Sequence, residues 1–264
     1  MLIVGEAELP EGLRALAGEV RELAVRSTRL AELPVWVGEL TRLEALEVSG
    51  VDYDGRNAVL KSLPASLGQL GALKQLTLAL LDGLEVLPDA VVRLTTLGSL
   101  TIDHCGKLRA LPRGIGKLGA LRQLTLEGLN ELQEMPDLIG LTALGSLTIS
   151  ECGKLRALPR GIGKLGALRV LALEGLDELQ EMPDTIGKLG ALRELTLGGL
   201  TELQEMPDLI TLTALGSLTI GTCKKLRALP RGIGKLGALK QLTLEWFDEL
   251  QEMPDLIEIG RAHV

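Results

Sequence analysis

The sequence predicts an α/β solenoid, in which short parallel strands stack into one sheet and helical or irregular segments return on the other side. Three observations support this. All eleven prolines occupy one position of a repeating pattern, each after a leucine or a methionine. Successive prolines lie 23 or 24 residues apart, except for the 30 residues between Pro34 and Pro64. The core is aliphatic, because aromatic residues form only 2% of the chain. A fixed period of this length is typical of stacked repeats.

Each unit divides into a strand and a return segment, as the stretch from 118 to 136 illustrates. Its apolar positions are Leu118, Leu121, Leu124, Leu126, Leu129, Leu132 and Met135. The single step of two predicts a strand with Leu124 and Leu126 on one face and Thr125 on the other. The steps of three suit tight turns or short helices. The proline then ends the extended pairing and fixes the backbone of the return segment.

We expect about ten such units to form one domain over residues 1–257. Six extra residues near 52–57 account for the long interval and place Tyr53 on a protruding loop. Tyr53 could contact a partner there, although a tolerated surface insertion is the alternative. The segment does not fit a calcium loop, because Gly55 is fourth from Asp52 instead of sixth and Leu63 is twelfth instead of glutamate.

Residues 258–264 break the pattern that earlier units keep after their prolines. Their sequence, Glu-Ile-Gly-Arg-Ala-His-Val, matches a translated sequencing-library adapter. We therefore interpret them as an artefact, expect the natural protein to continue past Ile257, and leave them out of the fold.

Composition and cysteine placement exclude several classes of protein. The net charge of -7 argues against a nucleic-acid partner. No apolar run approaches membrane-helix length, so we expect no membrane insertion, and the first ten residues lack the pattern of a secretory signal. Cys105, Cys152 and Cys223 share one repeat position two or three units apart, roughly 10 Å or more, which is too far for a disulfide. They predict buried reduced thiols and a cytoplasmic location.

The sequence shows no catalytic set, cofactor motif or metal-ligand spacing. Its two histidines are His104 and His263, and Cys105 should point inward while His104 points outward. The Gly-Ile-Gly-Lys text at 114–117 lacks the first glycine and the hydroxyl residue of a phosphate loop, and it recurs as a repeat turn. We therefore expect a protein that is not an enzyme.

The pattern L-x-x-L-x-L followed by a ladder residue resembles the leucine-rich repeat over nearly the whole chain. The ladder carries no asparagine; it holds Thr28, Val51, Leu81, Cys105, Leu129, Cys152, Leu176, Leu200, Cys223 and Phe247. Together with leucine-proline at the unit end, this resembles the repeats of plant intracellular nucleotide-binding immune receptors. The I-G-x-L-x-x-L text resembles plant Ras-group-related leucine-rich repeat proteins.

The resemblance implies a curved right-handed superhelix whose parallel sheet lines a concave, protein-binding face. It favours a fragment of the ligand-sensing region of an intracellular immune or signalling receptor. The alternatives are a stand-alone Ras-type signalling scaffold, or the substrate-recognition part of an enzyme whose catalytic domain is missing.

The concave face carries our candidate contact residues. A threonine row should run along its middle, bordered by Arg122, Arg169, Arg193 and Lys240. The column two residues later varies and, with its neighbours, supplies the candidates for protein binding: Asp103, His104, Glu127, Glu151, Glu174, Glu245 and Trp246.

Two further expectations concern the stacking of the units. Columns of alternating charge, such as Glu131 beside Lys154 and Asp137 beside Arg160, should pair between neighbouring units. Neither end shows a polar capping unit, so we expect end-to-end self-association.

Overall fold

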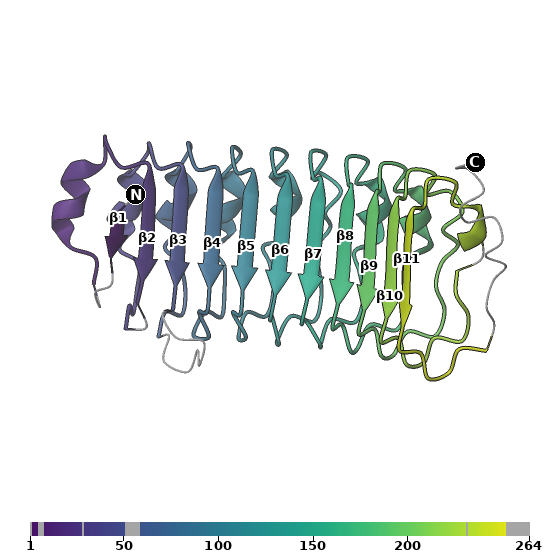
Figure 1. Cartoon of the computed structure of the whole chain (residues 1–264). Coiled ribbons are helices and arrows are strands. Elements are labelled where there is room, and N and C mark those ends of the chain that lie inside the picture. Colours follow the sequence, from purple (N-terminus) through teal and green to yellow (C-terminus); the bar gives the residue numbers. More distant parts are fainter. Residues whose placement is uncertain (1, 5–7, 28, 51–58, 231, 252–264) are drawn as a thin grey trace.

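Eleven parallel strands form one curved sheet in strict sequence order (Figure 1). The computed structural model describes residues 2–4, 8–27, 29–50, 59–230 and 232–251. The strands are β1 (Leu2–Val4), β2 (Glu22–Arg26), β3 (Ala45–Ser49), β4 (Gln75–Ala79), β5 (Ser99–Asp103), β6 (Gln123–Glu127), β7 (Ser146–Ser150), β8 (Val170–Glu174), β9 (Glu194–Gly198), β10 (Ser217–Gly221) and β11 (Gln241–Glu245). The predicted fold class is confirmed, and the sheet has one strand more than the ten units expected, because β1 pairs with β2.

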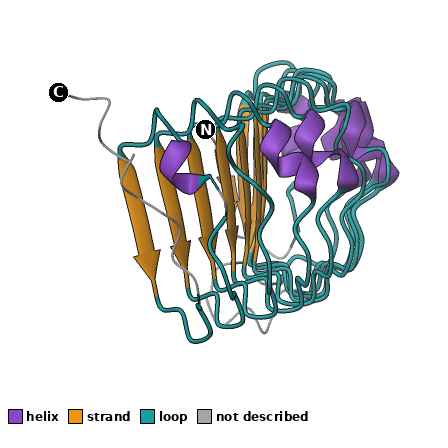
Figure 2. Cartoon of the chain, turned by 90° about the vertical axis from the view of Figure 1, so that its right-hand side faces the viewer, coloured by secondary structure: helices purple, strands orange, loops and turns teal. Residues whose placement is uncertain are grey.

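Short 3-10 helices cover the opposite side of the coils (Figure 2). They are η1 (Glu11–Leu16), η2 (Val35–Glu39), η3 (Ala65–Gln69), η4 (Asp89–Arg93), η5 (Ile115–Lys117), η6 (Arg160–Lys164), η7 (Asp184–Lys188) and η8 (Ile233–Lys235). Most begin directly after the repeat proline, whose fixed φ suits a helix start. The proline carbonyl then accepts the first turn's hydrogen bond, as between the Val37 amide and Pro34 at 3.0 Å. None of these described helices has the length and apolar character needed to span a membrane.

Two coils use a tighter turn in place of the 3-10 helix. After Pro136 and Pro207 the interval to the next proline is 23 residues instead of 24. In these coils an aspartate closes the turn: Asp137 Oδ1 accepts a 2.9 Å hydrogen bond from the Ile139 amide, and Asp208 does the same for Ile210. The missing residue therefore removes the helix, and the aspartate side chain replaces its hydrogen bonding.

The core is one continuous aliphatic column inside the coils. Along β7, Leu147 and Ile149 are fully buried while Thr148 is half-buried on the concave face. The register aligns identical repeat positions, so that Leu124 pairs with Leu147 and Thr125 with Thr148. The threonine row and the inward leucine column are both confirmed.

The alternating charges form only part of the expected pairing. Lys154 contacts Glu131 at 2.7 Å and Lys225 contacts Glu202 at 2.6 Å, as predicted. The column after proline behaves differently, because Asp137 and Asp208 accept backbone hydrogen bonds within their own turns. These pairs lie at the surface, where solvent screens them, so they contribute little to stability. Tyr53 and the two irregular segments at 52–57 and 258–264 lie outside the described residues.

All three cysteines are free and buried, as the repeat position predicts. Burial raises the pKa of the Cys105 thiol to about 12 and that of Cys152 to about 11. The native thiols should therefore react with iodoacetamide at least about tenfold more slowly than the thiols of the chain in denaturant. Mass spectrometry of timed samples measures this, and rapid native labelling of Cys105 or Cys152 would contradict the buried ladder.

Candidate functional site: the exit rim of the sheet

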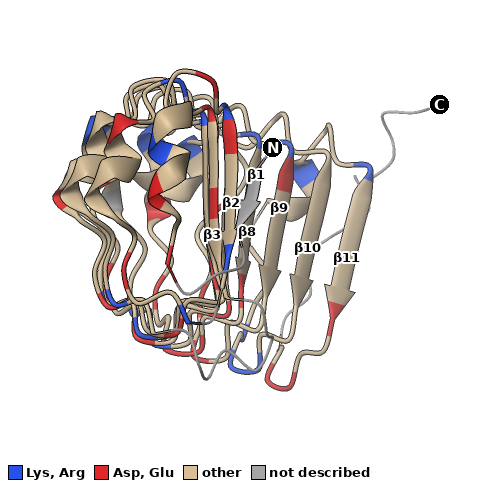
Figure 3. Cartoon of the chain, turned by 90° about the vertical axis from the view of Figure 1, so that its left-hand side faces the viewer, with Lys and Arg blue, Asp and Glu red and all other residues tan. Residues whose placement is uncertain are grey.

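The candidate residues lie where the strands end. We call this surface the exit rim, and define it as the last residue of each strand from β5 to β11 together with the residue that follows it. Its described members are Asp103, His104, Glu127, Gly128, Ser150, Glu151, Glu174, Gly175, Gly198, Gly199, Gly221, Thr222, Glu245 and Trp246. In Figure 3 the tip of β11 is red, because this strand ends in an acidic residue.

The backbone turns sharply at the second position of each pair. His104, Glu151 and Trp246 have φ values of 46°, 52° and 58°, and Gly128, Gly175 and Gly199 take the same position with φ near 60°. A non-glycine residue in this left-handed region costs about 1–2 kcal/mol. His104, Glu151 and Trp246 therefore hold a strained backbone conformation, and each places a side chain on the rim where other coils have glycine.

The left-handed turn directs the His104 ring over the next coil. A Cβ on Gly128 would lie 3.0 Å from Cγ of His104, so the ring occupies the space that a side chain there would need. Nδ1 of His104 lies 2.5 Å from Oδ1 of Asp103, and Nε2 lies 3.8 Å from Oε2 of Glu151. The hydrogen bond to Asp103 raises the pKa of His104 most, burial opposes it, and the charges of Asp103, Glu151 and Glu127 add to the rise.

The structure brings some of the predicted residues together and separates others. Asp103, His104, Glu127 and Glu151 meet on three consecutive coils, and Glu174 follows on the next coil. Glu245 and Trp246 lie three strands beyond Glu174, across the glycines and the threonine that end β9 and β10. Trp246 is 77% exposed. All seven candidates lie at the strand ends, as their repeat positions predict, and the structure divides them into two groups.

Comparison of the coils with one another shows where this chain has diversified. Residues 99–121 and 146–168 are identical except at two positions, where Asp103 and His104 are replaced by Ser150 and Glu151. A third copy, residues 217–239, changes the same two positions and one more, Lys224. Exposure to solvent alone does not explain why these positions vary, because three other exposed residues of the first copy recur in all three copies: Lys107, Arg109 and Lys117. Variation between these copies is concentrated in the exit rim.

The opposite ends of the strands form a basic rim. Lys74, Arg122 and Arg169 line a shallow groove of about 550 Å³ along the start of β4 to β8, and Gly98 and Gly145 stand in the coils between them. Arg122 and Arg169 belong to the basic border predicted from the sequence; Lys74 was not part of that prediction. From β4 to β8 the sheet thus carries basic residues where the strands begin, and from β5 to β8 it carries mainly acidic residues where they end.

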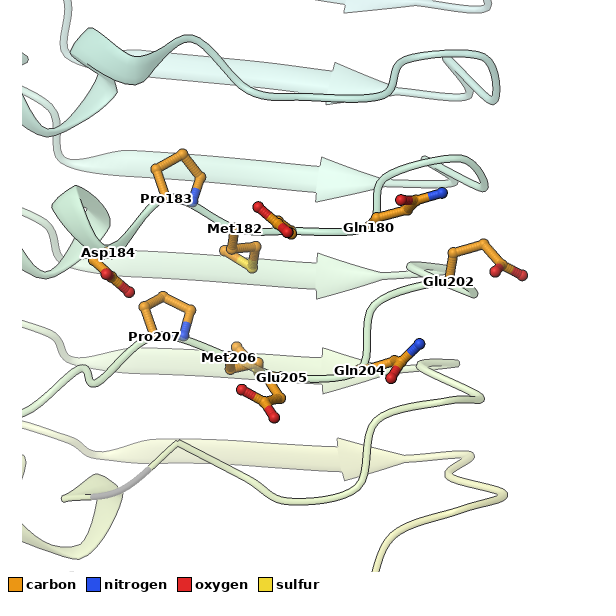
Figure 4. Close-up of a pocket in the computed structure, with 10 residues that line it drawn as sticks. Gln180, Met182, Pro183, Asp184, Glu202, Gln204, Glu205, Met206 and Pro207 are labelled. Atoms are coloured by element: carbon orange, nitrogen blue, oxygen red, sulfur yellow. The ribbon is translucent and has the colours of Figure 1, made fainter.

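A second groove of about 670 Å³ lies in the return segments after β8 and β9 (Figure 4). Its walls are two copies of one sequence, Gln-Glu-Met-Pro, at residues 180–183 and 204–207. Sequence analysis did not single it out. Because its walls are copied unchanged, it lacks the variation that distinguishes the exit rim.

No family model matches the sequence, and no curated protein matches it. Solved structures do match. The leucine-rich repeat domain of the type III effector XCV3220 (XopL) is 28% identical, with a TM-score of 0.74 over 85% of this chain and 76% of that one. The chain has the leucine-rich repeat fold.

Two further structures show the same fold at lower identity. The structure of the Arabidopsis receptor kinase HAESA with IDA and SERK1 matches at 22% identity and a TM-score of 0.58, over 86% of this chain and 38% of that chain. An internalin (inlF) from Listeria monocytogenes matches at 16% identity and a TM-score of 0.56, over 99% and 83%.

Proposed function

We propose that this leucine-rich repeat chain is a non-enzymatic recognition module that binds another protein through its exit rim. The observation that carries the proposal is the pair of otherwise identical coils that differ only at Asp103/Ser150 and His104/Glu151. Duplication has kept the core and the other exposed positions of these coils while the strand ends changed. Such a pattern is expected where a fixed scaffold presents variable contacts.

The size and chemistry of the rim suit a protein partner. From β5 to β11 it spans six strand steps, or about 29 Å. Its exposed tryptophan, Trp246, is of the residue type that most often dominates binding energy at interfaces. The rim carries four glutamates, which favour a partner with basic groups facing the strand ends: Glu127, Glu151, Glu174 and Glu245. Acidic groups of the same partner would face the basic rim.

The wider context follows from the resemblance. The module would be a fragment of the ligand-sensing region of a cytoplasmic immune or signalling receptor. HAESA, which shares this fold, was solved in complex with a peptide hormone and a co-receptor, and this supports the capacity of the fold for such a role.

Site-specific photo-cross-linking tests the proposal. A photoreactive residue in place of Glu174, on the exit rim, should capture a protein from an extract of the organism that expresses the chain. The matched control places it at Glu181, another exposed glutamate seven residues later in the return segment. Adducts at Glu174 alone are expected. Equal adducts at both positions, or adducts at Glu181 alone, would contradict the proposal.

The last strand also carries an expectation of self-association. Leu242 and Leu244 of β11 are only partly buried, whereas their counterparts Leu218 and Ile220 in β10 are fully buried. Apolar side chains at a sheet edge favour pairing with a second copy. Light scattering after size exclusion should show a mass that rises with concentration; a constant monomer mass would exclude end-to-end pairing.

A further inference from the structure

We propose that Asp103, His104 and Glu127 form a binding site for a divalent transition-metal ion, with Zn²⁺ as the best fit. The ligand atoms of the three side chains all lie within 4.8 Å of one another. Within the described residues, no other group of three or more histidine, cysteine, aspartate or glutamate side chains meets this criterion. The three come from the ends of β5 and β6, so 23 residues separate Glu127 from His104. The inference goes beyond the proposed protein-binding function.

The distances between these side chains define which atoms would bind. Zinc bonds to nitrogen and oxygen are about 2.0–2.2 Å, so tetrahedral ligands lie roughly 3.4 Å apart. Nδ1 of His104 and Oδ1 of Asp103 are 2.5 Å apart and would open slightly around an ion. The half-exposed Asp103 and Glu127 have the rotamer freedom for this adjustment. Because Nδ1 is the ring nitrogen beside Asp103, it is the nitrogen that would bind the ion.

The other ring nitrogen already faces a carboxylate. Nε2 of His104 lies 3.8 Å from Oε2 of Glu151, which belongs to the coil beyond Glu127. Histidines that bind metals commonly donate their second N–H to a carboxylate, which fixes the ring and increases its basicity. Glu151 is thus a positioning residue for the imidazole. The arrangement spreads over three coils and depends on their stacking.

The coil between the histidine and Glu151 leaves room for the ring. Gly128 has a φ of 62°, and an added Cβ would lie 3.0–3.1 Å from three atoms of His104. Any side chain at this position would press on the imidazole. With 47% of the His104 side chain exposed, a fourth coordination position is open to water or to a ligand from a partner protein.

The donor set decides the class of metal. One imidazole with two carboxylates suits Zn²⁺, whereas Mg²⁺ and Ca²⁺ prefer oxygen ligands alone. The adjacent Cys105 does not contribute a ligand, because it is fully buried and its sulfur faces the carbonyl oxygens of Leu78 and Asp103.

The chain contains its own control for this site. The coil of residues 146–168, whose strand ends at Ser150, is identical to the coil of residues 99–121 except that Ser150 and Glu151 replace Asp103 and His104, and it folds without either ligand. The coil after it still supplies Glu174 and the left-handed Gly175, the counterparts of Glu127 and Gly128. The substitutions Asp103→Ser and His104→Glu therefore remove the site. The reverse substitutions, Ser150→Asp and Glu151→His, rebuild it at the next copy of the coil.

Zinc titration of the whole chain, by calorimetry and by competition with a chromogenic chelator, tests the proposal. The unmodified chain should bind one Zn²⁺, and excess Mg²⁺ should not displace it. The double variant Asp103→Ser/His104→Glu, which copies the neighbouring coil, should lose at least about tenfold in affinity with an unchanged circular dichroism spectrum. Glu151→Gln should weaken binding by a smaller factor.

A four-substitution exchange variant makes the test specific. Asp103→Ser, His104→Glu, Ser150→Asp and Glu151→His keep the composition and transfer the pair to the next copy of the coil. We expect binding of one Zn²⁺ to return, weaker than in the unmodified chain because Gly199 stands where Glu151 stood. Any of three results would contradict the site. They are no Zn²⁺ binding by the unmodified chain, equal Zn²⁺ affinity in the unmodified chain and in Asp103→Ser/His104→Glu, and no recovery of Zn²⁺ binding in the exchange variant.

Discussion

Truncation of Ile149 to alanine is expected to lower the free energy of unfolding by about 2–5 kcal/mol. Ile149 is fully buried in β7, between Leu126 of β6 and Leu173 of β8. The substitution leaves a cavity in the middle of the apolar column, and each coil depends on its neighbours to cover its apolar edge. Urea unfolding followed by circular dichroism measures the loss.

The matched control is another isoleucine. Ile139 lies in the tight turn after Pro136 and is 41% exposed. Ile139→Ala should cost less than about 1 kcal/mol, because the side chain loses little buried area. Equal losses for Ile149→Ala and Ile139→Ala would mean that the leucine column does not hold the coils together.

Replacement of Gly163 by alanine is expected to be the second large effect. Gly163 lies in η6, and a Cβ there would lie 2.0 Å from the carbonyl oxygen of Thr185 and 2.7 Å from its carbonyl carbon. Neighbouring coils must separate to accept the methyl group, at a cost of about 1–3 kcal/mol. Thermal unfolding of Gly163→Ala should therefore show a clearly lower midpoint.

Gly166 provides the comparison three residues later. An added Cβ at Gly166 meets nothing within 4 Å. Gly166→Ala should be neutral or stabilise the chain by up to about 1 kcal/mol, because alanine restricts the unfolded state. A destabilisation as large as that of Gly163→Ala would show that the contact with Thr185 is not the cause.

The strands, the core and the members of the exit rim could be predicted from sequence because they follow from one local pattern. The step of two between Leu124 and Leu126 fixes which side chains face inward, and the period aligns them between coils. Cys105 and Thr125 follow the same rule. Their environments repeat, so a short stretch of sequence contains the information.

Other features depend on contacts that the pattern does not encode. The missing 3-10 helix after Pro136 results from a single absent residue and an aspartate that replaces its hydrogen bonds. The approach of His104 to Glu151 requires the left-handed turn at His104 and the absence of a side chain at Gly128. Aligning the columns of adjacent coils placed Asp103, His104 and Glu127 on one surface. It did not show that their ligand atoms converge, because this depends on the left-handed turn at His104.

The affinity of the cross-linked partner for charge-reversal variants tests the recognition surface most directly. Glu174→Lys changes the exit rim, and Glu181→Lys makes the same change in the return segment of the same coil. We predict that Glu174→Lys weakens binding at least about tenfold, or about 1.4 kcal/mol, while Glu181→Lys leaves it unchanged. Unchanged affinity in Glu174→Lys together with a loss in Glu181→Lys would place the binding surface on the opposite side of the solenoid and contradict the account.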